Sequence, residues 1–267
     1  MKSSTSVSSS DVLVRVRELS IAFDLQRYSS SLRDSFVEAA TNPLGLIRKR
    51  EQRFEALASV SLELRRGDRL AILGANGSGK TTLCRAITGM YGSRREVTVN
   101  GDVRAIFDTE AAVFPELSGR ENMEVISHLL FPRLRARERA ELVAEAIDFS
   151  ELAEFIDSPF KVYSKGMKAR LFLSLVSAKP ADILILDEVF NGADFFFNEK
   201  ITKRILRAIA ESHAAIFISH SHEVVQQVCN RAIVLQRGKV VFSGSCPEAV
   251  DYYLASGMAV APEASST

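Results

Sequence analysis

The sequence predicts an α/β protein built on a largely parallel sheet. Three observations support this. From residue 182 onward, short apolar runs alternate with helix-patterned stretches, which is typical of parallel strands joined by helices. The earlier strands are expected to be antiparallel. Residues 118–178 carry helical patterns with almost no strand signal, which indicates a helical insertion.

The elements follow in chain order. The run VLVRVREL (12–19) alternates valine with arginine and predicts a half-exposed strand. ALASVSLEL (56–64) alternates in the same way and predicts a second strand. RRGD predicts a turn, after which RLAILG predicts a buried strand. VTVNGDVRAIF (97–107) predicts a hairpin with Asn100 and Gly101 at its turn. Later elements are the helix RARERAELVAEAI, the strands DILILDE and AAIFISH, the helix SHEVVQQVC and the strand pair RAIVLQRGKVVFSG.

The chain is expected to hold one domain over residues 11–255, with the helical subdomain at 118–178 inside it. Polar, small residues at 1–10 and 256–267 predict disordered tails. Residues 24–53 fit neither the strand nor the helix pattern, and an insertion of this length is usually functional or disordered.

Composition excludes several classes of protein. The 267 residues carry a formal net charge of +1, which argues against a dedicated nucleic-acid binder. Cys84, Cys229 and Cys246 lie far apart without metal-ligand spacing, so reduced cytosolic thiols are expected. MKSSTSVSSS lacks the apolar core of a signal peptide, and no apolar run approaches the roughly 18 residues of a membrane span. Any membrane spans would come from another chain.

A phosphate-binding loop is the most specific motif. GANGSGKTT matches G-x-x-x-x-G-K-[ST], follows a buried strand and opens a helix, so a chance glycine-rich turn is the weaker interpretation. Its glycines let backbone N–H groups surround phosphates at a helix N-terminus. Lys80 is expected to reach the β- and γ-phosphates of ATP, and Thr81 to ligate Mg²⁺. The nucleotide-binding residues of this loop are Gly74, Ala75, Asn76, Gly77, Ser78, Gly79, Lys80, Thr81 and Thr82.

An acid pair ends the buried strand ILILDE. The carboxyl end of a central strand is where an α/β sheet presents ligand groups. Asp187 is therefore predicted to hold Mg²⁺, and Glu188 to orient the attacking water as a general base. A helix-capping pair is the alternative, and the phosphate-binding loop makes it the weaker one.

A phosphate-binding loop and an acidic strand end are compatible with kinases, GTPases and motor ATPases. The run YSKGM, upstream of ILILDE, distinguishes between these families. With the phosphate-binding loop, it resembles the signature of ABC transporter ATP-binding subunits, whose common form is Leu-Ser-Gly-Gly-Gln. The Tyr-Ser-x-Gly-Met form resembles the branch that exports O-antigen, capsule and teichoic acid. FPELSGREN (114–122) is similar to another run of that branch. The resemblance covers roughly residues 12–255 and implies the ABC-type ATPase fold.

The resemblance also implies roles for five further residues. Ser164 and Gly166 would contact the γ-phosphate of ATP held by a second copy, whereas either residue alone reads as an ordinary helix cap. Phe23 would stack on adenine, or else be a core aromatic at a strand end. Asp194 matches the acid of the D-loop. His220 matches the histidine that senses the γ-phosphate; its neighbour His222 is expected to be a bystander.

Three positions depart from the family pattern. Asp108, Thr109 and Glu110 occupy the region where many members carry a glutamine. Lys165 places a cation inside the signature. Ala193 replaces a glycine of the D-loop, which leaves the local backbone geometry there open.

The resemblance implies a bacterial ATPase subunit that powers export of a lipid-linked cell-surface polysaccharide. A second copy of the chain and two copies of a membrane-spanning permease are the expected partners, with no nucleic acid. The chain would lie peripherally on the cytoplasmic face of the inner membrane. The alternatives are an exporter subunit for a lipid, drug or metabolite, a P-loop kinase or related nucleotide enzyme, and a soluble ABC ATPase acting on ribosomes or DNA.

The insertion at 24–53 has two interpretations. SLRDSFVEAA spaces Leu32, Phe36 and Ala39 at helical intervals, and LIRKREQR groups four cations. A solvated charged hairpin is one interpretation. The other is that an apolar face packs on the permease while the cations meet anionic headgroups or a lipid-pyrophosphate-linked glycan.

Overall fold

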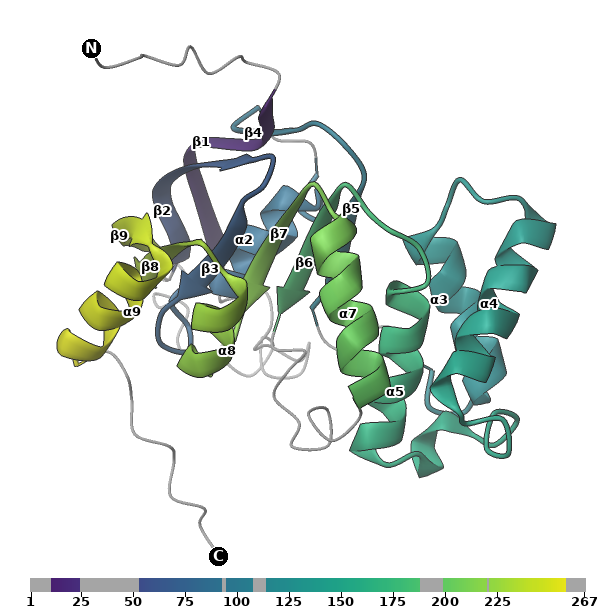
Figure 1. Ribbon diagram of the computed structural model, residues 1–267. Helices are drawn as coiled ribbons and strands as arrows, with labels where there is room; N and C mark the ends of the chain where they lie inside the picture. The colour runs from purple at the N-terminus through teal and green to yellow at the C-terminus, as the bar shows by residue number, and fades with distance from the viewer. Residues whose placement is uncertain are drawn as a thin grey trace, which may run out of the picture.

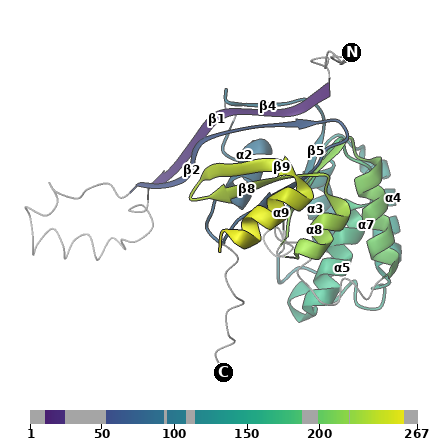
Figure 2. The ribbon, with the colours of Figure 1, turned by 60° about the vertical axis from the view of Figure 1, so that its left-hand side comes forward.

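Two sheets with a helix between them form the centre of the molecule (Figures 1 and 2). The computed structural model describes residues 11–24, 53–92, 95–107, 114–187, 199–219 and 221–257. Its strands are β1 (Val12–Asp24), β2 (Arg53–Arg65), β3 (Arg69–Leu73), β4 (Val97–Val99), β5 (Val103–Ile106), β6 (Ile183–Asp187), β7 (Ala214–Ile218), β8 (Arg231–Gln236) and β9 (Lys239–Ser245). Its α-helices are α2 (Lys80–Ile87), α3 (Gly119–Leu130), α4 (Ala136–Ser150), α5 (Lys165–Val176), α7 (Glu199–Glu211), α8 (His222–Val228) and α9 (Cys246–Ala255), and a short 3₁₀ helix, η3, spans Phe160–Val162.

The larger sheet confirms the predicted parallel architecture. Its order is β5-β6-β7-β3-β8-β9, and every pair is parallel except the terminal β8–β9 hairpin. All five residues of β6 and of β7 are buried, as expected for strands covered on both faces. The smaller sheet, β2-β1-β4, is antiparallel, as the opening strands predicted.

Alternate residues of the parallel strands feed two separate cores. Ile183 and Ile185 join α2 and the antiparallel sheet on one face. Leu184 and Leu186 join α3, α4, α5 and α7 on the other face. Helix α2 is therefore enclosed between the two sheets, while the helices of the 119–176 region stand on the opposite side of the larger sheet (Figures 1 and 2).

The hairpin predicted over 97–107 is wrong. Strand β4 pairs with β1, with Val99 opposite Val14, whereas β5 pairs in parallel with β6 in the other sheet. Asn100 and Gly101 do form the bend. The Asn100 side chain donates to the Val12 carbonyl at 3.0 Å, and Gly101, at φ +130°, lies against the Asp182 side chain. The local turn signal was correct, but the two strands on either side of the turn pair with strands of different sheets.

The described residues also bear on the predicted boundaries. Asp24 and Arg53, the two end residues of the predicted insertion, are paired with each other across β1 and β2. The rest of that insertion, the tail at 1–10 and the tail from residue 258 onward lie outside the described residues. None of the helices in the described ranges is both long and apolar enough to cross a bilayer.

Candidate functional site

The predicted phosphate-binding loop connects the end of β3 to the start of α2. Gly79 is the N-cap of α2 at φ +106°, and no side chain caps the first turn. A Cβ on Gly79 would lie 2.5 Å from the Ala56 carbonyl oxygen, and one on Gly74 would lie 2.3 Å from the Leu235 carbonyl oxygen. Glycine is therefore required at both positions, and the bare N–H groups of the helix start remain available to an anion.

Lys80 folds back over this loop. Its side chain is 8% exposed, and its Nζ donates to the carbonyl oxygens of Gly74 at 2.8 Å and Ala75 at 3.1 Å. An ammonium at this position adds a positive charge to the helix N-terminus. The arrangement places a cation and backbone donors together, which is the chemistry that binds a polyphosphate.

Thr81 and Asp187 meet although 106 residues separate them. Thr81 Oγ1 donates to Asp187 Oδ2 at 2.7 Å. Asp187 is 4% exposed at the carboxyl end of β6, and Thr81 lies in the first turn of α2. A hydroxyl and a carboxylate beside a phosphate-binding loop are oxygen ligands of the kind that Mg²⁺ prefers. The two residues predicted to serve one metal are thus in contact.

The donor set of the loop fits a bound nucleotide. Ser78 Oγ is buried, and within the described part of the chain it has no hydrogen-bond partner. A buried hydroxyl without a partner calls for an explanation, and a phosphate oxygen would supply the missing bond. Clusters of three or more His, Cys, Asp or Glu side chains that could hold a metal are absent from the described ranges. Thr81 and Asp187 would supply oxygen ligands to Mg²⁺, and phosphate oxygens and water are also ligands that this ion accepts.

A cysteine underlies the site without taking part in it. Cys84 is fully buried one turn along α2 from Lys80. Burial raises the pKa of its thiol well above the ordinary value, and the negative charge of Asp187 raises this pKa further. The thiol stays neutral at physiological pH and acts as a small apolar side chain.

The signature residues lie at the start of α5. Ser164 is the exposed N-cap, and its side chain accepts a hydrogen bond from the Met167 N–H at 3.2 Å, as the sequence predicted for a cap. Gly166 is half-buried and Lys165 exposed. Because α5 leads into β6 and runs opposite to it, α5 begins at the end of the molecule where β6 terminates (Figure 1). The start of α5 therefore lies at the same end of the molecule as the end of β6, where Asp187 is located.

Phe23 remains a candidate for contact with a nucleotide base. Its side chain is 37% exposed near the end of β1, so it is not a core residue. The Tyr91 ring meets it edge-on, with centroids 5.8 Å apart and planes at 64°. Phe54 is its cross-strand neighbour and is 47% exposed. Tyr91 was missed from the sequence, because nothing in its local pattern indicates a contact with β1.

Several predicted site residues cannot be placed. Glu188, Asp194 and His220 lie outside the described residues, as do the family-variant positions 108–110 and Ala193. Their roles stay predictions. His222, expected to be a bystander, begins α8 and packs its ring 5.6 Å from that of Tyr253.

Comparison with known proteins agrees with this geometry. A sequence model of the ABC transporter family matches residues 57–191, a segment that begins within β2 and runs past the acidic end of β6.

Two relatives are identical to this chain at about a third of the aligned positions. The O-antigen export system ATP-binding protein RfbE of Yersinia enterocolitica is 34% identical over 80% of this chain and 89% of its own length. The teichoic acids export ATP-binding protein TagH of Lactococcus lactis is 35% identical over 80% of this chain. The chain spans 46% of that second relative's length.

Solved structures share the fold. A post-hydrolysis dimeric structure of the ATP-binding cassette MJ0796, bound to ADP and Pi, superposes with a TM-score of 0.65 at 18% identity, over 88% of this chain and 99% of that one. The family match, the identity to export ATP-binding proteins and the fold lead to one conclusion. The chain belongs to the ABC transporter family and is an ATPase domain of that family.

Proposed function

We propose that this chain is the ATP-hydrolysing subunit of an exporter for a lipid-linked cell-surface polysaccharide. The observation that carries the ATPase role is the contact between Thr81 and Asp187 at the bare N-terminus of α2. Two of its relatives are named as export ATP-binding proteins for O-antigens and for teichoic acids, and these names support a polysaccharide as the substrate.

The residues of one chain would divide the work of phosphoryl transfer to water. The loop N–H groups and Lys80 hold the β- and γ-phosphates, and Thr81 and Asp187 hold the metal. When bound, Mg²⁺ would offset the negative charge that develops on the phosphates. Glu188, the next residue after Asp187, would orient the attacking water and accept its proton. Phe23 would stack on the base.

A second copy would complete each site. Ser164 and Gly166 present a hydroxyl and a helix N-terminus that suit the γ-phosphate of nucleotide held by the partner's loop. Asp194 and His220 are the further residues expected at this junction. Two copies would then close head-to-tail over two nucleotides, and hydrolysis would reopen them.

Movement of the dimer would drive a membrane-spanning permease, also present in two copies. The subunit itself would lie on the cytoplasmic face of the bacterial inner membrane as a peripheral protein. The polysaccharide would be bound by the permease, so that this chain meets its substrate only indirectly.

A chromosomal Lys80→Ala exchange tests the proposal in cells that carry the gene. We expect the surface polysaccharide to disappear and its lipid-linked precursor to accumulate inside. Lys239→Ala, at an exposed lysine of β9, serves as the control and should leave export intact. Normal surface glycan in the Lys80→Ala strain, with another compound retained instead, would assign the exporter to a different substrate.

A further inference from the structure

One buried charged residue of the larger sheet is not among the residues predicted to bind the nucleotide. Arg104, in the edge strand β5, is 4% exposed and stands opposite Leu184 of β6. Burial of an arginine is costly unless its donors are satisfied. Its partners therefore indicate what the residue does.

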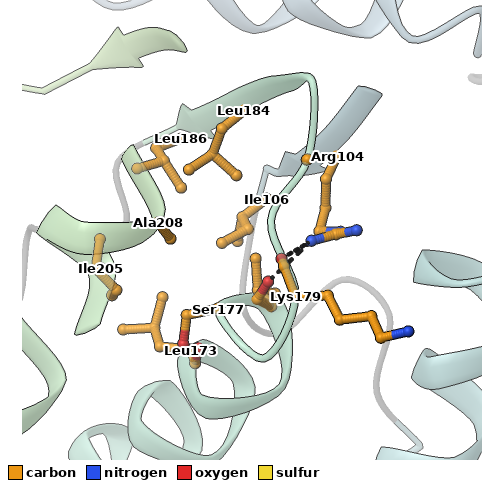
Figure 3. A pocket seen from close by; sticks show the side chains of 11 residues that line it. Arg104, Ile106, Leu173, Ser177, Lys179, Leu184, Leu186, Ile205 and Ala208 are labelled. Carbon is orange, nitrogen blue, oxygen red and sulfur yellow. Dashed lines mark hydrogen bonds between the residues drawn. The ribbon is translucent and has the colours of Figure 1, made fainter. Parts of the chain in front are cut away.

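Those partners are the carbonyl groups that end helix α5. The guanidinium donates to the Val176 carbonyl oxygen at 3.3 Å and to that of Lys179 (Figure 3). It also donates to the Pro180 carbonyl oxygen at 3.5 Å. Val176 is the last residue of α5, and the other two lie in the turn into β6. A cation at this position also complements the negative end of the helix dipole.

The same guanidinium touches a second helix of the 119–176 region. Its central carbon lies 4.3 Å from the ring centroid of Phe131, the buried C-cap of α3. Asp102, on the approach to β5, lies 3.7 Å away and offsets the charge. One side chain of the sheet thus joins the ends of α3 and α5.

A small gap in the apolar packing lies beside this contact. A small cavity separates β5 and β6 from α5 and α7 (Figure 3). Its walls include Ile106, Leu173, Leu184, Leu186, Ile205 and Ala208. The apolar side chains of α5 pack on the sheet in the core described above, and the hydrogen bonds of Arg104 add directional contacts that fix the C-terminal end of this helix.

The N-terminal end of α5, opposite to the end that Arg104 contacts, carries the signature residues Ser164 and Gly166. The helix has 12 residues, which corresponds to a rod of about 18 Å. A tilt of about 10° at Val176 would move Ser164 by about 3 Å over that length. Misplacement of a catalytic contact by about 1 Å is enough to slow a reaction about a hundredfold.

We propose that Arg104 is a positioning residue, which fixes the C-terminal end of α5 to the nucleotide-binding sheet so that Ser164 and Gly166 meet the nucleotide of a second copy. The inference rests on the composite site of the proposed function. Arg104 touches no nucleotide itself and serves the partner's site rather than that of its own chain.

Purified Arg104→Met and Arg104→Lys chains test this role, and the lysine variant keeps a positive charge and one donor nitrogen. ATP affinity of either chain, measured with a fluorescent analogue, should stay within about twofold of wild type because the loop is intact. The kcat for ATP hydrolysis should fall about tenfold or more in Arg104→Met and less in Arg104→Lys.

Arg139→Met is the matched control. Arg139 also donates to carbonyl groups at a helix end, those of Phe131 at 3.0 Å and Leu134 at 2.8 Å, but it has no bond to α5. It should lower stability without the same loss of kcat. Equal losses in the two methionine variants, or a parallel rise in the dissociation constant for ATP, would overturn the proposal.

Mixed dimers separate a role in the partner's site from a role in the chain's own site. Arg104→Met chains are combined with Glu188→Gln chains, which should be inactive alone but carry an intact α5. The mixture should hydrolyse ATP several times faster than the mean of the two separate preparations. A mixture no faster than that mean overturns the proposal.

Ser164→Arg chains, mixed with Glu188→Gln chains in parallel, report on the composite site itself. If this mixture regains activity while the Arg104→Met mixture does not, only the role of Arg104 is refuted. If Ser164→Arg homodimers are fully active, the composite site of the proposed function fails instead.

Discussion

Thr81 Oγ1 lies 2.7 Å from Asp187 Oδ2, which joins the first turn of α2 to the end of β6. The contact holds two oxygen ligands at the mouth of the phosphate-binding loop. We therefore expect the Mg²⁺ requirement of the ATPase to depend on the Thr81 hydroxyl. Thr81→Ala should raise the Mg²⁺ concentration for half-maximal ATPase activity about tenfold or more, whereas Thr81→Ser should stay close to wild type. A titration with Mg²⁺ after treatment with EDTA measures this.

Thr88→Ala is the control for that experiment. Thr88 ends the same helix, and its hydroxyl donates to the Arg85 carbonyl at 2.9 Å, away from the loop. It should not change the Mg²⁺ requirement. An unchanged requirement in Thr81→Ala as well would show that the Thr81 hydroxyl is not a ligand.

Glu188→Gln should retain ATP binding and lose most turnover. General-base contributions run to about 10²–10⁴-fold, and the amide cannot accept the proton of water. The variant should accumulate as an ATP-bound dimer, which size-exclusion chromatography detects. Glu211→Gln, which only removes an exposed pair with Arg207, should behave as wild type. Phosphate release near the normal rate would remove Glu188 from its assigned role.

Ser164 and Ser118 allow stability and catalysis to be separated. Both are N-caps, of α5 and α3 respectively, and both side chains accept a hydrogen bond from a backbone N–H three residues on. Alanine at either position should cost about 1 kcal/mol of folding free energy, measured by urea denaturation. Only Ser164→Arg should block hydrolysis while leaving nucleotide binding intact. If Ser118→Arg slows turnover equally, capping alone explains the effect.

Gly119→Ala should destabilise the chain although alanine favours a helix. A Cβ at this position would lie 2.3 Å from Tyr163 Oη, and that hydroxyl donates to the Phe155 carbonyl at 2.6 Å. Overpacking of this kind typically costs about 1–3 kcal/mol. Tyr163→Phe removes the clashing atom, so the double variant should be more stable than the sum of the two single changes predicts. Strict additivity would show that the clash is relieved elsewhere.

Reversal of Arg48, Lys49 and Arg50 to glutamate tests the insertion. The isolated subunit should keep its ATPase activity, while export by the assembled transporter should weaken. Near an anionic leaflet each cation contributes about 1 kcal/mol, so glutamine at the same positions should give a smaller defect. Export at the wild-type level in the glutamate variant would make the insertion a spacer.

The sequence determined the local features of this protein. The spacing of GANGSGKTT required a loop between strand and helix, Ser164 and Gly166 predicted the start of α5, and continuous apolar runs predicted strands buried on both faces. Each of these depends on residues a few positions apart, whose backbone preferences and hydrogen bonds are decided nearby.

Tertiary structure decided which distant residues meet. Asn100 and Gly101 predicted a turn, but they did not indicate that β4 and β5 belong to different sheets. Nothing near Arg104 in the sequence indicates that its side chain donates hydrogen bonds to the carbonyl groups at the end of α5. The available signal was a charged residue within the short apolar run VRAI. Phe23 and Tyr91 likewise meet only in the fold. Such contacts depend on the burial of whole faces of sheets and helices, and that burial is a property of the assembled core rather than of any short stretch of chain.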